Sequence, residues 1–267
     1  MMEPLKAIIG LSLKLLLRSR KTLVMAVLAL APSVLAFLGV IIARVNPDSV
    51  GITGFGLASE LFVPAYLHFF VIGLPLFYAT SFIREEVDEK TITYIFVRPI
   101  PKATIYAGKY IAGTLASMVL VIPSAALMLG VLSTLDPLSE VLRHSGVFLQ
   151  DLAILGLGIM AYCALFGAFG ALLKRPLLWG GLFAIVWEVF VTYIPGYIHN
   201  FTILHHLLSL LPHPSSQRGS LKLFEAITSL SQSTPPAISV ITIFAISGAL
   251  LALSCWVVSR KEYLLEA

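Results

Sequence analysis

The sequence predicts an all-α integral membrane protein, and three features carry this prediction. Hydrophobic residues make up 58% of the 267 residues and charged residues only 12%, against about 45–50% and 25% in soluble domains. The mean hydropathy is +0.94. The apolar residues fall in long runs with almost no charge, and about 20 such residues cross the roughly 30 Å of hydrocarbon as a helix. A soluble enzyme and a nucleic-acid-binding domain are therefore both disfavoured.

The first segment, residues 3–21, is too charged to cross a membrane. Its basic residues recur every three or four positions, and leucines and isoleucines lie between them. This spacing predicts an amphipathic helix lying in the interface, with its basic face toward lipid headgroups or water. That face consists of Lys6, Lys14, Arg18 and Lys21.

Six membrane spans are expected after this helix, each bounded by charge or by Pro and Gly clusters. They lie at about residues 22–43, 61–83, 105–132, 149–173, 177–195 and 237–259. The first run continues past Pro32, which favours a retained span over a cleaved signal peptide. Prolines at 32, 64, 75 and 123 predict kinks whose freed carbonyls neighbouring helices or hydroxyl groups satisfy. We expect one transmembrane domain over residues 1–267, without a nucleotide-binding domain.

Two loops contain further helical signals. Asp136-Pro137 marks a helix start, so loop 133–148 is expected to hold one short interfacial helix. The loop 196–236 contains two segments of helical period, at 203–211 and 221–230. Four histidines lie in it, but adjacent histidines face different sides of a helix and no Cys or carboxylate is near, so no metal site is expected. The histidines are His199, His205, His206 and His213.

The distribution of Lys and Arg predicts the orientation. Five lie in the amino-terminal segment, five in the loop after the second span, two after the fourth span and two in the tail, against four on the opposite side. The positive-inside rule then places both termini in the cytoplasm. The net charge of +4 reflects this asymmetry across the membrane, so nucleic acid is not an expected partner.

The loop from 84 to 104 holds the densest charge of the chain. Glu86 and Lys90 are four residues apart, in the order that favours a helical ion pair. Tyr94, Ile95 and Phe96 add an apolar face. Such a segment is either a short helix that a protein partner binds or a solvated loop that satisfies the charge rule.

This loop resembles the signature of the ABC type 2 transporter permeases. The acidic stretch at 83–94 is followed by Arg98-Pro99, by the basic Lys102 and by Gly108-Lys109 at the start of the third span. The sequence departs from the family pattern at Lys90, where Gly is usual, and at Lys102, where Arg is more common. The amphipathic start, the six spans and the long loop before the last span extend the resemblance over essentially the whole chain.

The resemblance implies a transmembrane permease subunit of an ATP-binding-cassette exporter, which forms a homodimer or heterodimer and docks two ATPase subunits in the cytoplasm. A coupling helix would seat in the ATPase, and its implied docking residues are Glu85, Glu86, Asp88, Glu89, Lys90, Thr91, Tyr94 and Arg98. The chain has no phosphate loop, since Tyr110 follows Gly108-Lys109 where Ser or Thr is required. We therefore expect no enzyme activity and no cofactor in this chain, with ATP and Mg on the partner ATPase.

Glu188 is the single acidic residue placed deep in a predicted span, beside Trp187. A carboxylate there costs roughly 2.5–3.5 kcal/mol on insertion scales. Two interpretations remain open: a role of Glu188 and Trp187 in the transport pathway or dimer interface, and a purely structural role near the external headgroups.

Two other classes of function stay as alternatives. An ion-coupled secondary transporter usually needs several intramembrane ionisable groups, and a non-transporting membrane scaffold would have the same composition. A membrane-embedded enzyme is disfavoured because H-E-x-x-H and G-x-S-x-G are absent. The expected location is the cell membrane, in particular a prokaryotic inner membrane, and neither composition nor motif indicates the substrate.

Overall fold

The protein is a bundle of long helices, and no strand occurs in the part of the chain that the structure describes. The computed structural model describes residues 2–45, 53–88, 100–192, 198–212 and 234–260. Its amino-terminal half contains α1 (Met2–Arg18), α2 (Arg20–Val45), α3 (Gly54–Phe62), the π-helical η1 (Val63–Phe70), α4 (Val71–Ala79) and α5 (Ser81–Asp88).

Two long helices follow, α7 (Lys102–Leu132) and α8 (Leu138–Leu172), joined through the 3₁₀ turn η2 (Ser133–Leu135). The remaining elements are α9 (Pro176–Phe183), the π-helical η3 (Ala184–Phe190), the 3₁₀ turn η4 (Ile198–Phe201), α10 (Ile203–Ser209) and α12 (Pro236–Arg260).

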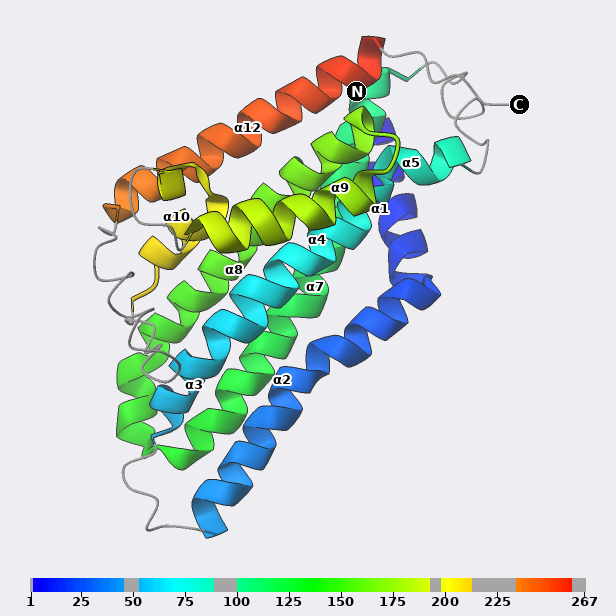
Figure 1. Cartoon of the computed structure of the whole chain (residues 1–267). Coiled ribbons are helices and arrows are strands. Elements are labelled where there is room, and N and C mark those ends of the chain that lie inside the picture. Colours follow the sequence, from blue (N-terminus) through cyan, green and yellow to red (C-terminus); the bar gives the residue numbers. More distant parts are fainter. Residues whose placement is uncertain (1, 46–52, 89–99, 193–197, 213–233, 261–267) are drawn as a thin grey trace.

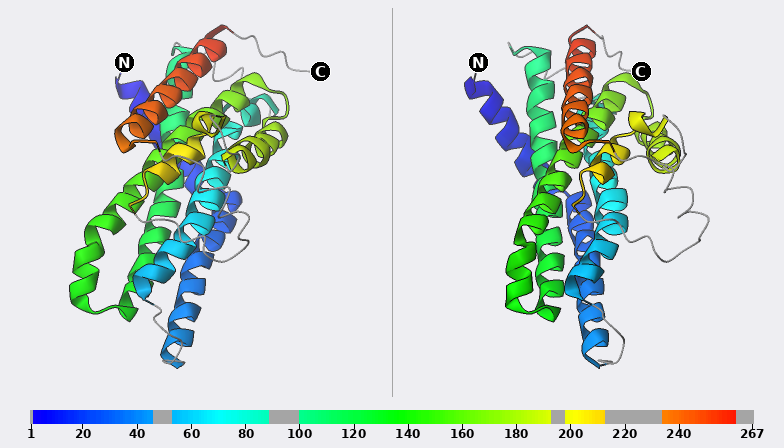
Figure 2. Two further views of the ribbon diagram at one scale, coloured as in Figure 1. Left: turned by 60° about the vertical axis from the view of Figure 1, so that its left-hand side comes forward. Right: turned by 90° about the vertical axis from the view of Figure 1, so that its left-hand side faces the viewer.

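The centre of the bundle is formed by α7 and α8. Helix α7 packs against α1, α2, α8 and α12, while α8 packs against α4, α7 and α12 (Figure 1). The start of α1, the whole of α5 and the end of α12 lie at one end, which we name the α5 end (Figure 2). The turn between α7 and α8 lies at the other end, which we name the turn end.

Five helices in the described ranges are long and apolar enough to cross a membrane: Arg20–Val45, Gly54–Arg84, Lys102–Leu135, Leu138–Leu172 and Pro236–Arg260. They coincide with five of the six predicted spans. The predicted span at 177–195 corresponds to the shorter apolar helix Pro176–Phe190. At 1.5 Å per residue this helix reaches only about 20–25 Å, less than the hydrocarbon thickness of about 30 Å.

Helices α9 and η3 run from the α5 end to α10, which lies part of the way along the bundle, and α12 returns to the α5 end (Figures 1 and 2). The predicted helix at 203–211 is confirmed as α10. The predicted segment at 221–230 lies outside the described residues.

The predicted separate helix in loop 133–148 is wrong. Pro137 caps a helix as the sequence indicates, but that helix is α8 itself, which continues without a break to Leu172. The polar residues between 139 and 150 do not break the helix, because none of them is a proline and the one glycine, Gly146, costs only about 1 kcal/mol. The predicted start of this span at 149 is therefore eleven residues late.

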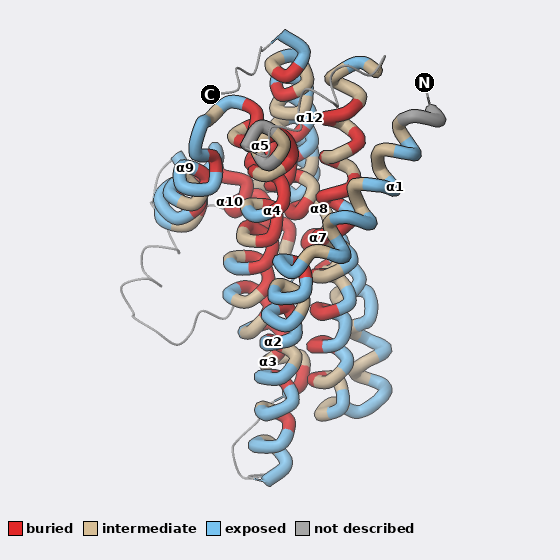
Figure 3. The backbone as a smooth tube through the Cα atoms, turned by 90° about the vertical axis from the view of Figure 1, so that its right-hand side faces the viewer, coloured by how far each residue is buried: buried red, intermediate tan, exposed pale blue. Residues whose placement is uncertain are grey.

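Burial separates a central helix from two outer ones. The carboxyl-terminal half of α8 is mostly buried inside the bundle, whereas α2 and α12 expose most of their apolar side chains (Figure 3). Exposed Leu23, Val27, Val34, Phe37 and Ile41 on α2 form a surface that suits lipid. The largest fully buried side chains include Tyr66, Tyr106 and Tyr162.

Hydroxyl groups bridge the helices near two of the prolines. Ser124 follows Pro123 in α7, and its hydroxyl donates to the Ala29 carbonyl in the turn before Pro32. The Ser33 hydroxyl donates to the Ser124 carbonyl at 3.1 Å, and Tyr66 Oη lies 2.9 Å from Ser124 Oγ. A proline frees the carbonyl four residues before it, which belongs to Leu28 for Pro32 and to Val119 for Pro123. The bonds described here involve the carbonyls of Ala29 and Ser124 instead, so the predicted hydroxyl partners of the freed carbonyls stay a prediction.

Candidate functional site

The predicted ATPase-docking segment begins in α5, at the α5 end. Glu85, Glu86 and Asp88 belong to this helix. The other members of the predicted set, Glu89, Lys90, Thr91, Tyr94 and Arg98, lie outside the described residues. The structure thus places the first part of the set on a helix, and the docking role remains a prediction.

Glu86 has a partner on another helix. The Lys109 ammonium, near the start of α7, forms an ion pair with the Glu86 carboxylate. The same ammonium donates to the carbonyl of Phe82 at 2.7 Å. Both side chains are mostly buried, with 14% of Lys109 and 17% of Glu86 exposed. Lys109 therefore joins α5 to α7 through two contacts on one face of α5.

Two glycines on α7 allow close helix contacts beside this ion pair. A Cβ on Gly108 would lie 2.7 Å from Ile8 Cγ2 of α1, and a Cβ on Gly113 would overlap the ring of Phe82. The Phe82 ring also packs edge-on against Tyr106, with centroids 6.4 Å apart. Glycine at these two positions permits the approach of α1 and α5, since a Cβ there would require Ile8 or Phe82 to move.

The predicted basic face is exposed, and it is divided between two helices. Lys6, Lys14 and Arg18 lie on α1 and Lys21 lies on α2, because the predicted helix 3–21 ends at Arg18. Ile8 of α1 faces α7. Leu11 and Leu15 are exposed beside these cations. Exposed leucines next to lysines and arginines suit the boundary between headgroups and acyl chains.

A second polar site surrounds Glu188, which is 1% exposed. Tyr162 Oη of α8 donates to its carboxylate at 2.7 Å. The backbone N–H groups of Leu204 and Ile203, at the start of α10, donate to it at 3.0 and 3.4 Å. Glu188 therefore ties η3 to α8 and to the first turn of α10, where helical N–H groups lack an intrahelical partner.

Glu188 lies on the buried stripe of a helix that is otherwise largely exposed. Gly180 and Ala184, eight and four residues before it, are also buried. Ile185, Val186 and Phe190 on the same segment are at least half exposed, and Trp187 is partly exposed and stacks on Phe183. Spacing of four residues keeps Gly180, Ala184 and Glu188 on one face of the helix. Glu188 contacts α8 and α10 from this face, and the pathway or interface role of Glu188 and Trp187 remains a prediction.

Threonines and histidines extend the Glu188 site around α10. Thr192 Oγ1 donates to the Glu188 carbonyl at 2.5 Å and lies 2.9 Å from Thr202 Oγ1, which caps α10. His205 Nε2 lies 3.0 Å from Thr234 Oγ1. His206 Nδ1 lies 3.2 Å from Ser239 Oγ of α12, and its Nε2 lies 2.9 Å from the Asn200 carbonyl.

The histidine rings form a buried group. The centroids of His199 and His205 are 4.2 Å apart, and those of His205 and His206 are 5.5 Å apart. Burial, with smaller contributions from His199 and His206, lowers the pKa of His205 to about 4. Burial also lowers the pKa of His206. These two histidines are neutral at physiological pH and act as packing and hydrogen-bonding groups.

Asp151 is a buried carboxylate that the sequence analysis missed. It is 2% exposed and lies thirteen residues into α8. The sequence did not single out Asp151 as an intramembrane carboxylate because the predicted span begins at 149, which places Asp151 at the membrane boundary. Its neighbour Gln150 donates from Nε2 to the carbonyl of Leu210 at 3.0 Å, so α8 also holds the carboxyl end of α10.

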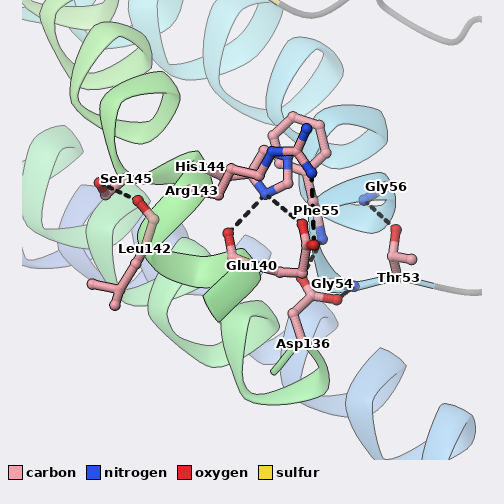
Figure 4. A network of polar contacts seen from close by, with 10 residues as sticks. All are labelled: Thr53, Gly54, Phe55, Gly56, Asp136, Glu140, Leu142, Arg143, His144 and Ser145. Carbon is pink, nitrogen blue, oxygen red and sulfur yellow. Dashed lines mark hydrogen bonds and ion pairs between the residues drawn. The ribbon is translucent and has the colours of Figure 1, made fainter. Parts of the chain in front are cut away.

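The turn end has a separate polar network (Figure 4). Asp136 accepts the N–H groups of Gly54 and Phe55 at 2.8 and 2.9 Å and so caps α3. The Phe55 ring stacks on His144, with centroids 4.1 Å apart, and His144 Nδ1 lies 2.9 Å from the Glu140 carbonyl. This network fixes the start of α3 against the α7–α8 connection.

The fold and these sites define a multi-pass membrane protein whose polar groups are paired between helices inside an apolar bundle. The sequence model of the ABC-2 family transporter proteins matches residues 14–193, more than half of the chain, so the chain belongs to this family. A search of curated proteins found no match. The matched range includes Glu86, Lys109 and Glu188 and ends before α10 and α12. Membership implies partnership with an ATP-binding-cassette ATPase subunit.

Proposed function

We propose that this chain is the transmembrane permease subunit of an ATP-binding-cassette exporter. It dimerises, with a second copy or with a related chain, and couples ATP hydrolysis by a separate ATPase to substrate movement across the membrane. The family match over residues 14–193 carries the proposal. The five long apolar helices and the shorter helix Pro176–Phe190 supply the membrane domain that such a subunit needs.

The α5 end is the cytoplasmic side in this proposal. The start of α1, α5, the start of α7 and the end of α12 lie at this end, and each carries basic residues, as the positive-inside rule requires. With Pro176–Phe190 as a short fifth crossing, six crossings leave both termini in the cytoplasm. The membrane is the prokaryotic inner membrane.

The ATPase docks on the segment that begins with α5. ATP and Mg are bound by the ATPase, because this chain lacks the phosphate loop that would hold them. ATP binding draws two coupling segments together, and the helices attached to them move. This chain contributes no catalytic residue to hydrolysis.

The test is co-purification of the chain with a co-expressed ATP-binding-cassette ATPase, followed by measurement of hydrolysis. We expect vanadate-sensitive ATP hydrolysis that is stimulated only in the assembled complex. Charge reversal of Glu85, Asp88 and Glu89 together is expected to abolish co-purification while leaving the Glu86–Lys109 contact intact. Glu140→Lys, at the turn end, is the control and should leave it unchanged. Binding that survives the triple reversal would overturn the docking assignment.

The buried carboxylates Glu188 and Asp151 favour the ion-coupled transporter as the second candidate. The contacts of Glu188 with Tyr162 and α10 argue against it, since they engage this carboxylate within the chain. Uptake or efflux driven by an imposed ion gradient, in liposomes containing this chain alone, would decide for the second candidate.

A further inference from the structure

We propose that Lys109 is a positioning residue for energy coupling, which fastens the coupling segment to the membrane bundle and transmits its movement to α7. This inference rests on the proposed function and adds the residues by which movement enters the bundle. Lys109 does not contact the ATPase or a substrate in this role.

The first observation is that one ammonium group holds α5 at two points. Lys109 bonds the Glu86 carboxylate and the Phe82 carbonyl, four residues apart and therefore on the same face of α5. An ion pair alone would leave α5 free to pivot about a single point. Two contacts of the Lys109 ammonium, one of them with the backbone of α5, restrain α5 against α7 more than the ion pair alone would.

The second observation is that the helices next to Lys109 are packed too closely for α5 to move independently of α7. The Phe82 ring sits against Gly113, and Ile8 of α1 sits against Gly108. On α8, a Cβ at Gly170 would lie 2.8 Å from the Thr80 carbonyl, at the bend between α4 and α5. Side chains pack directly on the backbone of Gly108 and Gly113, and the Thr80 backbone packs on Gly170. These contacts join α1, α5, α7 and α8 at the α5 end, and close-packed interiors transmit displacement rather than absorb it.

The third observation is the charge and burial of the contact. Lys109 and Glu86 lie mostly out of water between two helices, where screening by salt is weak. Removing one partner leaves the other buried without its charge partner. A partly buried ion pair is therefore suited to keep α5 and α7 together when α5 moves. An exposed ion pair contributes little to stability.

It follows that the acidic residues of the coupling segment have two different roles. Glu86 acts inward, on Lys109, and Glu85, Asp88 and Glu89 act toward the ATPase. Breaking the contact between Glu86 and Lys109 should leave ATPase binding unchanged. The nucleotide state of the ATPase should then no longer affect α7.

The experiment uses the full chain in complex with its ATPase and compares hydrogen exchange with and without vanadate-trapped nucleotide. In the unmodified complex, trapping should change the exchange of amides in both α5 and α7. In Lys109→Met, we expect the ATPase to co-purify as before, the response of α5 to persist and the response of α7 to fall by about fivefold or more.

Three further variants separate positioning from folding. Lys109→Arg keeps the charge and the donors and should retain the α7 response. Glu86→Gln keeps the shape of the side chain and should lose the response as Lys109→Met does, which covers the case that Lys109→Met does not fold. Lys174→Met removes an exposed lysine between α8 and α9 and should behave as the unmodified chain.

The outcomes distinguish the two proposals. Failure of the unmodified chain to bind an ATPase refutes the proposed function and this inference with it. Binding in the unmodified chain, with the same α7 response in Lys109→Met and Glu86→Gln, refutes the inference alone. Loss of ATPase binding in Lys109→Met, with the chain still folded, assigns Lys109 to the docking surface and also refutes the inference.

Discussion

Replacing Glu188 by alanine should loosen α10 from the bundle and lower the stability of the whole chain. The carboxylate accepts two well-formed hydrogen bonds, from Tyr162 Oη at 2.7 Å and from the Leu204 N–H at 3.0 Å. The third, from the Ile203 N–H, is longer at 3.4 Å. Alanine leaves these three buried donors without an acceptor.

The magnitude follows from the two shorter bonds. Bonds to a charged group contribute about 1.5–3 kcal/mol each in water-soluble proteins, and interhelical hydrogen bonds in membranes about 0.6–2 kcal/mol. Two bonds of this kind amount to about 2–4 kcal/mol. A change of 1 kcal/mol shifts Tm by about 2–4 °C in a chain of 150–250 residues, so Tm should fall by about 5–15 °C. Tyr162→Phe, which removes one bond, should lower it by roughly half as much.

The assay is thermal unfolding in detergent, followed by reaction of a fluorogenic thiol reagent with Cys163 in a Cys255→Ser background, because the Cys255 thiol is partly exposed. The Cys163 thiol is fully buried in α8 and becomes reactive only when the bundle opens. Val186→Ala, on the same π-helical segment but half exposed, is the matched control and should shift Tm by no more than about 1–2 °C. The reasoning is refuted if Glu188→Ala behaves like this control, or if Tyr162→Phe destabilises the chain more than Glu188→Ala does.

Three further predictions concern other parts of the bundle. The pKa of His205 falls from 6.5 to about 4 on folding, so the unfolded chain binds more protons than the folded chain between these pH values. The free energy of unfolding should therefore decrease as pH falls from 6.5 to 4, by at most about 3 kcal/mol. Tm should be lower at pH 5 than at pH 7.5, and His205→Gln should reduce this difference. Gly54→Ala should cost about 1–3 kcal/mol, because its Cβ would overlap the Leu132 carbonyl, whereas Gly146→Ala, with open space around it, should be neutral or slightly stabilising in the same Tm measurement. Ser124→Ala should cost about 1–2 kcal/mol through the lost bond to the Ala29 carbonyl, and a Tm unchanged from that of the parent chain would contradict this.

The membrane-spanning runs could be predicted from the sequence because hydropathy is a property of consecutive residues. Five of the six predicted spans lie within the long apolar helices of the structure. The predicted start of the fourth span at 149 is wrong because polar residues before it do not interrupt the helix. The helix α8 begins directly after Pro137. The correct start also moves Asp151 from a boundary to the interior.

Pairing between side chains could not be predicted in the same way. For Glu86 the sequence suggests Lys90, four residues on, but the described partner is Lys109, 23 residues away. The Gly108-Lys109 pair was visible as a family signature, yet its contacts with Ile8 and Glu86 depend on how α1, α5 and α7 cross. Similarly, nothing local to Glu188 indicates that it contacts Tyr162 and the start of α10.

The sequence by itself determined the class of this protein, because the cost of placing polar groups in hydrocarbon is summed residue by residue along the chain. It also determined which segment carries the densest charge and where the basic residues lie. Only the tertiary structure decided that Lys109 holds α5 and that Glu188 holds α10. Those contacts depend on the rotation and crossing of helices that are distant in sequence, and the packing that fixes these angles is a property of the whole bundle.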